Sequence, residues 1–352
     1  MKNKVTLIVL VVLMCVSAQA QNNTTNSKRK VGVVLSGGGA KGFAHIGVLK
    51  VIDSLGIKVD YVGGTSMGAI IGGLYASGYS GKELDSIFKN IDFNDLINDR
   101  LPRSTRDLYQ RSNAEKYAIT IPFDDFKISI PSALTRGQNT YNLLSKLTLH
   151  VSETKDFKKL PIPFLCIATN IETGDAVVLE EGHLPEAIMA SGALPTLFQP
   201  VFLDGDMLVD GGVINNYPVD ELKARGINYI IGVDVQDDLL KRDDLKSAPD
   251  VLLQISNFNT IKAMETKLDE TDIYIKPDIK DFSMISFGEG AEIIHNGEKA
   301  ALERLEQLKT LSQNKQHIYY KNQKHQDSIT INDFTFEGNN SYSRSYLLEK
   351  LK

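Results

Sequence analysis

Short apolar runs alternate with helical patterns along most of the chain. Residues 31–35 form an apolar run, and residues 43–55 follow it with apolar positions at helical spacing. The same order returns from residues 57–62 into a helix of small residues, and residues 229–235 form another apolar run. Runs that are apolar at every position are typical of strands buried on both faces, and their alternation with helices favours a parallel sheet. The pattern therefore predicts an α/β fold.

The second half of the chain adds hairpins and longer helices. Residues 164–170 and 176–179 predict two strands joined by a Glu-Thr-Gly-Asp turn, and residues 184–191 predict a helix. The longest helical patterns cover residues 251–268 and 291–311. One continuous domain is therefore expected over residues 31–312.

The start of the chain differs in composition from the rest. A basic start, an apolar stretch at residues 5–16 and an Ala-Gln-Ala motif that ends at Ala20 predict a signal peptide over residues 1–20. A lipoprotein signal that uses Cys15 is disfavoured, because a large methionine precedes that cysteine. Residues 21–30 are polar and predict a disordered linker. The protein is thus expected to be exported to the periplasm, the outer membrane or the cell surface.

The end of the chain predicts a separate piece. Residues 313–328 are polar and predict a linker, and residues 329–352 read as one strand, a turn and the start of a helix. So short a unit does not bury its own apolar face, which predicts a truncated module.

Composition narrows the classes of function. The 352 residues carry a net charge of −5, which argues against nucleic acid as a partner. Only Cys166 would remain after signal cleavage, so an intramolecular disulfide is not expected. No zinc-ligand spacing occurs in the sequence, and neither a metal nor a cofactor is expected.

A serine lies in a glycine-flanked turn after the second predicted strand. The pattern G-x-S-x-G centres on Ser66 and is formed by Gly64, Thr65, Met67 and Gly68. Placed between a strand and a helix, this pattern is typical of a nucleophile elbow, where small neighbours let the backbone bend sharply.

A glycine-rich loop after the first predicted strand allows two interpretations. Its glycines and small residues are Gly37, Gly38, Gly39, Ala40 and Gly42. Their bare backbone N–H groups, beside a serine, suit an oxyanion hole. The loop also matches G-x-G-x-x-G with Asp60 at about the distance of a ribose-binding acid, so a nucleotide-binding oxidoreductase is a rival.

A third predicted strand ends in an aspartate, and this side chain is expected to point into the same crevice as Ser66. Asp210 closes the run 207–209 and is followed by Gly211 and Gly212, which turn the chain. A Ser-His-Asp esterase that uses His295 is a mechanistic alternative, because the order of the three residues suits an α/β-hydrolase. Against it, His295 falls in the middle of a predicted helix, whereas such a histidine usually lies on a loop.

Four blocks of the sequence resemble the patatin-like phospholipase family. They are residues 37–42, 64–68, 190–195 and 210–218, and they occur in the family's order over a motif core of residues 31–225. The resemblance implies a three-layer α/β/α fold with a mostly parallel central sheet. It also implies a Ser66–Asp210 dyad without histidine, and an oxyanion hole built chiefly from the N–H groups of Gly38 and Gly39.

The resemblance further implies a phospholipid or other acyl-ester substrate, taken from a membrane surface. Leu194, Leu197, Phe198 and Val201 are candidates for lining an apolar channel. Residues 329–339 are similar to the start of a POTRA module, which can precede an outer-membrane β-barrel in secreted bacterial patatins. A homodimer through the long C-terminal helices and a non-catalytic surface module are further hypotheses.

Overall fold

The structure is a computed structural model of the chain. It describes residues 29–99, 123–124, 127–128, 133–239, 241–242, 245, 248–312, 333–336 and 341–350.

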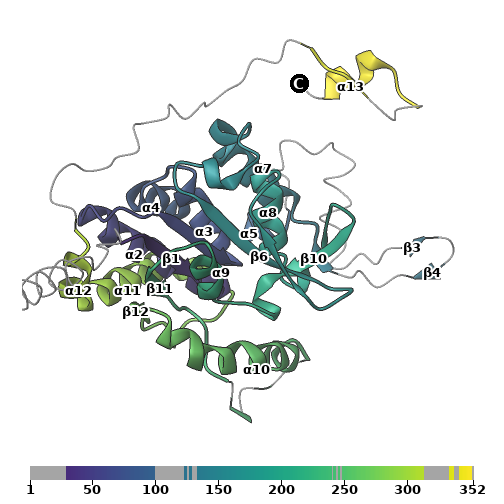
Figure 1. The fold of residues 1–352 in the computed structure, drawn as a ribbon. Helices are drawn as coiled ribbons and strands as arrows, with labels where there is room; N and C mark the ends of the chain where they lie inside the picture. Colours follow the sequence, from purple (N-terminus) through teal and green to yellow (C-terminus); the bar gives the residue numbers. More distant parts are fainter. Residues whose placement is uncertain are drawn as a thin grey trace, which may run out of the picture.

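An eight-stranded sheet forms the middle of the molecule (Figure 1). Its strands run in the order β12 (Ile273–Ile275), β11 (Tyr229–Val233), β1 (Val31–Leu35), β2 (Tyr61–Thr65), β6 (Phe164–Asn170), β10 (Asp206–Asp210) and β9 (Val201–Leu203), and β7 (Ala176–Leu179) pairs with β6. The first five strands of that order are parallel, whereas β7, β9 and β10 join by antiparallel pairing. The predicted mostly parallel sheet is confirmed.

Strand residues alternate between two apolar layers, which explains why the runs are apolar throughout. Phe164, Cys166 and Ala168 of β6 pack into the larger core, and Leu165 and Ile167 pack into the smaller one. Both faces are therefore buried, as a parallel sheet requires.

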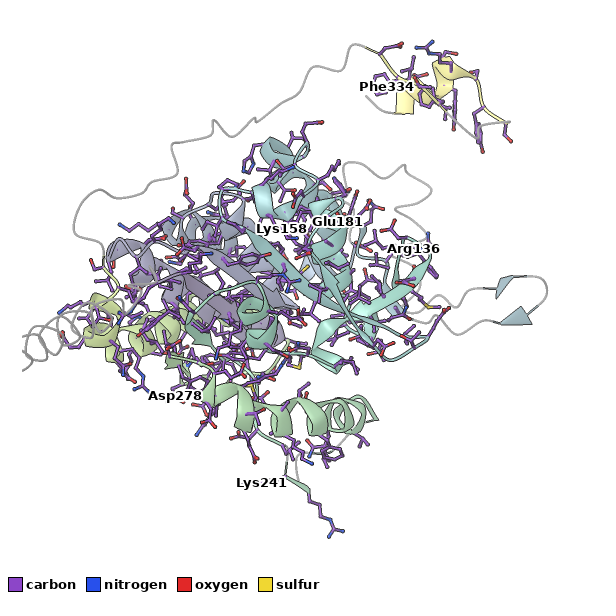
Figure 2. The ribbon with its side chains drawn as sticks, viewed as in Figure 1. Arg136, Lys158, Glu181, Lys241, Asp278 and Phe334 are labelled. Atoms are coloured by element: carbon purple, nitrogen blue, oxygen red, sulfur yellow. The ribbon has the colours of Figure 1, made fainter. Side chains whose placement is uncertain are left out.

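Helices cover the two faces unequally (Figure 1). The larger core is closed by α2 (Ala44–Ser54), α3 (Met67–Ala76), α4 (Gly81–Lys89), α7 (Gln138–Leu147), α8 (Leu184–Ser191) and α11 (Gly290–Glu303). The smaller core is closed by α9 (Val219–Ala224) and α10 (Ala248–Asp269). Charged side chains such as Arg136, Lys158 and Asp278 lie on the surface (Figure 2).

Short elements complete the chain. They are the 3-10 turns η1 (Gly39–Phe43), η3 (Leu149–Val151), η4 (Phe157–Lys159), η5 (Gly211–Val213) and η7 (Phe287–Glu289), the helices α5 (Phe93–Ile97), α12 (Leu305–Lys309) and α13 (Arg344–Lys350), and the paired short strands β3 (Phe123–Asp124) with β4 (Lys127–Ile128) and β5 (Ala133–Thr135) with β8 (Thr196–Phe198). The single helix expected over residues 291–311 is instead two helices, α11 and α12, with a break at Arg304.

The predictions for the two ends fall largely outside the described residues. This holds for the signal peptide at 1–20 and for the linker at 313–328. Of the linker expected at 21–30, Arg29 and Lys30 are described, and Lys30 is held by a 2.8 Å hydrogen bond from its N–H to the Asn228 side chain. At the C-terminus α13 matches the expected helix, but residues 333–336 form no strand, so a POTRA-like unit is not confirmed. Within the described ranges, no helix has the length and hydropathy needed to cross a bilayer.

Candidate active site

Ser66 occupies a sharp turn between β2 and α3. Its backbone has a φ of 55° and a ψ of −123°, which a non-glycine residue adopts only under strain. The turn is tight enough that a Cβ added to Gly68 would lie 2.2 Å from the carbonyl oxygen of Leu35. The glycines of the predicted elbow are therefore required by close backbone approach, and the elbow presents Ser66 at the N-terminus of α3.

Two polar contacts hold this strained turn. The backbone N–H of Ser66 donates to Ser191 Oγ at 3.1 Å, and that hydroxyl donates to the carbonyl oxygen of Ile167 at 2.5 Å. On the preceding residue, Thr65 Oγ1 donates to the carbonyl oxygen of Asn215 at 2.9 Å. The elbow is thus tied to α8, to β6 and to the segment after Asp210.

Asp210 lies directly opposite the serine hydroxyl. Ser66 Oγ donates to Asp210 Oδ2 at 2.6 Å, and the N–H of Gly212 donates to Asp210 Oδ1 at 2.7 Å. The backbone of Asp210 is fixed as well, since its N–H donates to Ala193 and its carbonyl oxygen accepts from Thr169 Oγ1, both at 3.0 Å. Antiparallel pairing brings the end of β10 beside the end of β2 across β6, which explains how residues so far apart in sequence meet.

Burial changes the acidity of this carboxyl group. Asp210 is 3% exposed, and desolvation raises its pKa to about 6, while the hydrogen bonds from Ser66 and Gly212 act in the opposite direction. A carboxylate with a pKa closer to neutrality is a better proton acceptor for a hydroxyl than an exposed aspartate is.

The glycine-rich loop passes beside the serine. A Cβ added to Gly37 would lie 2.8 Å from the Cβ of Ser66. The N–H of Gly37 donates to Asn216 Oδ1 at 3.0 Å, and the N–H of Ala40 donates to the carbonyl oxygen of Met284 at 2.8 Å. The predicted donors Gly37 and Ala40 therefore already have protein acceptors.

The two amides between Gly37 and Ala40 differ in their hydrogen bonding. The N–H groups of Gly38 and Gly39 have no acceptor among the residues that the structure describes. Gly39 has a φ of +58°, and a Cβ there would lie 2.4 Å from the Met284 carbonyl oxygen, so glycine is needed at this position. Gly42 packs against Met67, where an added Cβ would be 2.3 Å from the methionine side chain.

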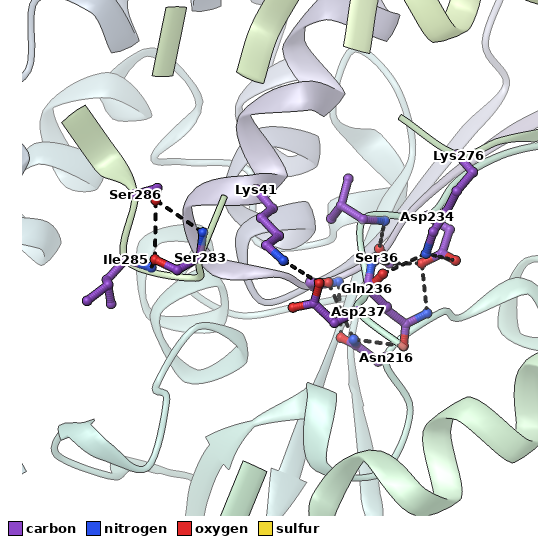
Figure 3. Close-up of polar contacts among 12 residues, drawn as sticks. Ser36, Lys41, Asn216, Asp234, Gln236, Asp237, Lys276, Ser283, Ile285 and Ser286 are labelled. Atoms are coloured by element: carbon purple, nitrogen blue, oxygen red, sulfur yellow. Dashed lines mark hydrogen bonds and ion pairs between the residues drawn. The ribbon is translucent and has the colours of Figure 1, made fainter. Parts of the chain in front are cut away.

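A polar network anchors the loop from behind (Figure 3). Asn216 Nδ2 donates to Gln236 Oε1 at 2.9 Å, and Gln236 Nε2 donates to Asp234 Oδ1 at 3.0 Å. Lys276 Nζ donates to Asp234 Oδ2 at 2.8 Å, and this ion pair holds the pKa of Asp234 below its usual range against the effect of burial. Lys41, which is buried, forms an ion pair with Asp237.

The described histidines take no part in the hydrogen bonds around Ser66 and Asp210. His295 is exposed on α11, and no histidine of the described residues hydrogen-bonds to Ser66 or Asp210. His45 is buried, and desolvation lowers its pKa to about 4, while its Nε2 contacts the carbonyl oxygen of Ser36 at 2.8 Å. This arrangement disfavours the Ser-His-Asp alternative.

The geometry also argues against the dinucleotide interpretation. Asp60 precedes β2, at the opposite end of the sheet from the glycine-rich loop, and its Oδ2 accepts the N–H of Val31 at the start of β1. A ribose-binding acid belongs at the carboxyl end of the second strand. The expectation that Asp60 stands in that position is therefore wrong. Within the described part of the chain, no cluster of three or more His, Cys, Asp or Glu side chains could hold a metal ion.

Comparison with known protein families identifies the family of this chain. The profile of the family described as patatin-like phospholipase matches residues 33–223. The chain belongs to the patatin-like phospholipase family. The family assigned on the four sequence blocks is confirmed, and so is the three-layer α/β/α fold that it implied.

Relatives of this patatin-like protein include fungal enzymes. It is 30% identical over 296 residues to a lysophospholipase NTE1 of Scheffersomyces stipitis and 29% identical over 300 residues to that of Candida albicans. The alignments cover 77% and 78% of this chain but only 18% and 20% of those relatives. Among solved structures, VipD from Legionella pneumophila matches with a TM-score of 0.47 and 16% identity, over 80% of this chain and 67% of VipD.

An apolar pocket opens beside the serine of this patatin-like site. Ser66 and Gly39 stand at the pocket, and the rest of its wall is almost entirely apolar. Of the four residues expected to line a channel, Leu194, Leu197 and Phe198 line this pocket. Val201 is not among its lining residues. Most of the wall comes instead from α3, α5, α7 and α8, and of their lining residues the sequence motifs marked only Met67.

Two polar residues of the site had no predicted role. Ser191 and Asn216 both lie inside the blocks that carried the family resemblance, and each contacts the backbone of a predicted site residue. Their signal was a polar residue next to glycine-rich or small-residue segments. Met284, whose carbonyl oxygen accepts from Ala40, lies in a loop without any motif.

Proposed function

We propose that this protein is a serine acyl hydrolase that cleaves carboxylic ester bonds of phospholipids or lysophospholipids. The observation that carries the proposal is the 2.6 Å hydrogen bond from Ser66 Oγ to the buried carboxyl of Asp210, at the edge of an apolar pocket. A nucleophile, a proton acceptor and room for an acyl chain are the parts that ester cleavage needs.

In the first half-reaction, Ser66 Oγ attacks the ester carbonyl carbon and its proton passes to Asp210 Oδ2. The carbonyl oxygen becomes an oxyanion, which the N–H groups of Gly38 and Gly39 would bind because they have no acceptor among the described residues. Collapse of the tetrahedral intermediate breaks the ester bond. The alcohol or lysolipid leaves with the proton from Asp210, and the fatty acyl group remains on Ser66.

In the second half-reaction, water attacks the acyl-serine. Asp210 accepts a proton from this water and returns it to Ser66 Oγ as the fatty acid leaves, which restores the starting state. The strained backbone of Ser66 and the positive end of α3 support charge development at the same point.

The apolar pocket and the relatives support a lipid substrate. Fungal relatives named lysophospholipases align with most of this chain, although this chain spans about a fifth of their length. A membrane or micelle surface is the expected source of such a substrate.

The proposal is tested with a fluorophosphonate probe and with lipid product analysis. Wild-type protein should be labelled covalently and should release fatty acid from lysophosphatidylcholine or phosphatidylcholine vesicles. Ser66→Ala should lose both signals. Ser86→Ala, which changes an exposed serine on α4, is the matched control and should keep both. Labelling and fatty-acid release that persist in Ser66→Ala would refute the assignment.

A further inference from the structure

The apolar pocket beside Ser66 has a second pocket as its neighbour. The second pocket is lined partly by the exposed residues Lys89, Asn90 and Asn94, so it opens at the protein surface. Five residues line both pockets: Phe88, Ile91, Phe93, Ile285 and Phe287. These residues form a partition with the acyl pocket on one side and a space open to solvent on the other.

Aromatic rings make up most of the partition. Phe93 stacks on Phe287 with ring centroids 5.3 Å apart and planes at 15°, and it also contacts Phe88 at 6.0 Å. Behind them, Phe43 lies 4.9 Å from Phe93 and 5.8 Å from Phe287 between ring centroids. Phe43 lines only the second pocket, the one that opens at the surface. Phe93 and Phe287 line both pockets, so the partition is about one ring thick at these two residues.

The partition differs from the other walls of the acyl pocket. Leu74, Leu144 and Ile188 come from long helices and are at most 2% exposed, with packed core behind them. Phe93 and Phe287 are half-buried and lie on a five-residue helix and a three-residue 3-10 turn. Loss of one of these two rings would therefore connect the pocket to existing space rather than leave a closed cavity.

The helix α3 gives a scale for the pocket. Met67, Ile70 and Leu74 line it along one face of the helix, starting next to Ser66. At about 1.5 Å of rise per residue, Leu74 lies roughly 12 Å along the helix axis from Ser66. The wall that α3 contributes is therefore about 12 Å long.

We propose that Phe93 and Phe287 limit the length of the acyl chain that the pocket accepts. This inference rests on the proposed acyl hydrolase function and adds a specificity determinant to it. A chain that reaches the partition is stopped by the two rings, so that any further carbons remain in water or displace the stacked pair.

The test measures kcat/KM for saturated esters from butanoyl to palmitoyl in wild-type protein, Phe93→Ala and Phe287→Ala. Each truncation should raise the ratio of palmitoyl to decanoyl hydrolysis about tenfold, the lower end of what apolar pocket contacts discriminate. Phe202→Ala is the matched control, because Phe202 is 73% exposed on β9 and lines neither pocket. Its ratio should equal that of wild type. Phe287→Leu serves if either alanine variant fails to fold in a thermal melt.

The outcomes separate this inference from the proposed function. Unchanged palmitoyl-to-decanoyl ratios in folded, active variants would overturn the role of the partition and leave the hydrolase intact. Absence of hydrolysis in wild type would instead refute the hydrolase. In that case displacement of a fluorescent fatty acid still measures the pocket, and equal length preferences in wild type and Phe287→Ala would overturn the partition.

Discussion

Replacing Asp210 by asparagine should abolish activity and, at neutral pH, stabilise the fold. The asparagine side chain has nearly the same shape as aspartate. Its oxygen can accept from Gly212, as Asp210 Oδ1 does at 2.7 Å, and its amide can face Ser66 Oγ, which lies 2.6 Å from Oδ2. What the substitution removes is the negative charge and the ability to take a proton.

The size of the effect on stability follows from the pKa of Asp210. Its pKa is raised from 3.8 to about 6 in the folded protein. Between these two values the folded state holds a proton that the unfolded state has lost, so the free energy of unfolding falls as pH rises. This rise in the pKa of Asp210 corresponds to roughly 3 kcal/mol of unfolding free energy, which wild type lacks above pH 6 and retains below pH 4. Asparagine does not titrate and carries no such deficit.

Thermal melts of wild type and Asp210→Asn at low and at neutral pH measure this difference. At about 2–4 °C per kcal/mol, Asp210→Asn should gain on the order of 5–10 °C over wild type at pH 8, and much less near pH 4. Above pH 6, ester hydrolysis should fall by about 10³-fold, and the difference should shrink at lower pH, where wild-type Asp210 is itself protonated. In wild type, kcat/KM should rise with pH up to about 6, where Asp210 loses its proton, and then level off.

Different results would contradict the expected effect on stability and the expected effect on catalysis. A melting-temperature difference that is the same at both pH values would mean that the folded protein does not pay for a buried charge at Asp210. Hydrolysis retained in Asp210→Asn would mean that another group accepts the serine proton.

Two further substitutions test the roles of His295 and Asn216 in ester hydrolysis. His295→Ala should keep most ester hydrolysis, because the side chain is exposed on α11; a loss as large as that of Asp210→Asn would restore the triad. Asn216→Ala should lower kcat about a hundredfold with little change in KM, because it frees the Gly37 amide that now donates to Asn216 Oδ1. Steady-state kinetics on a soluble ester would test this, and a raised KM with unchanged kcat would indicate a role in binding instead.

The sequence predicted the sheet well because its signal is local. Every residue of β1 and β6 is buried, and runs of this kind carry their pattern in consecutive positions. The helix α8 and the β6–β7 hairpin also follow from local patterns and turn residues. Helix ends were less predictable: nothing in the apolar spacing of residues 291–311 marks the break at Arg304.

The parts of the candidate site where a close backbone approach requires glycine could be predicted from the sequence. The parts that depend on packing between distant segments of the chain could not. Gly39 and Gly68 stand where the backbone leaves no room for a side chain, so a motif records them. Much of the wall of the apolar pocket comes from helices α3, α5, α7 and α8 and from the loop before α11. Those residues read as ordinary amphipathic core, because an apolar residue facing a pocket has the same pattern as one facing a neighbour.

The strained and desolvated groups of this site are also the ones that its proposed chemistry uses. Ser66 adopts a positive φ, and Asp210 is charged in a buried position only at a cost that its hydrogen bonds reduce in part. The sheet core supplies the stability that tolerates both. Substitutions that relieve either cost should therefore raise the melting temperature and lower the rate together. A higher melting temperature together with a lower rate distinguishes a functional site from a strained part of the core, where relief of the strain would not lower the activity.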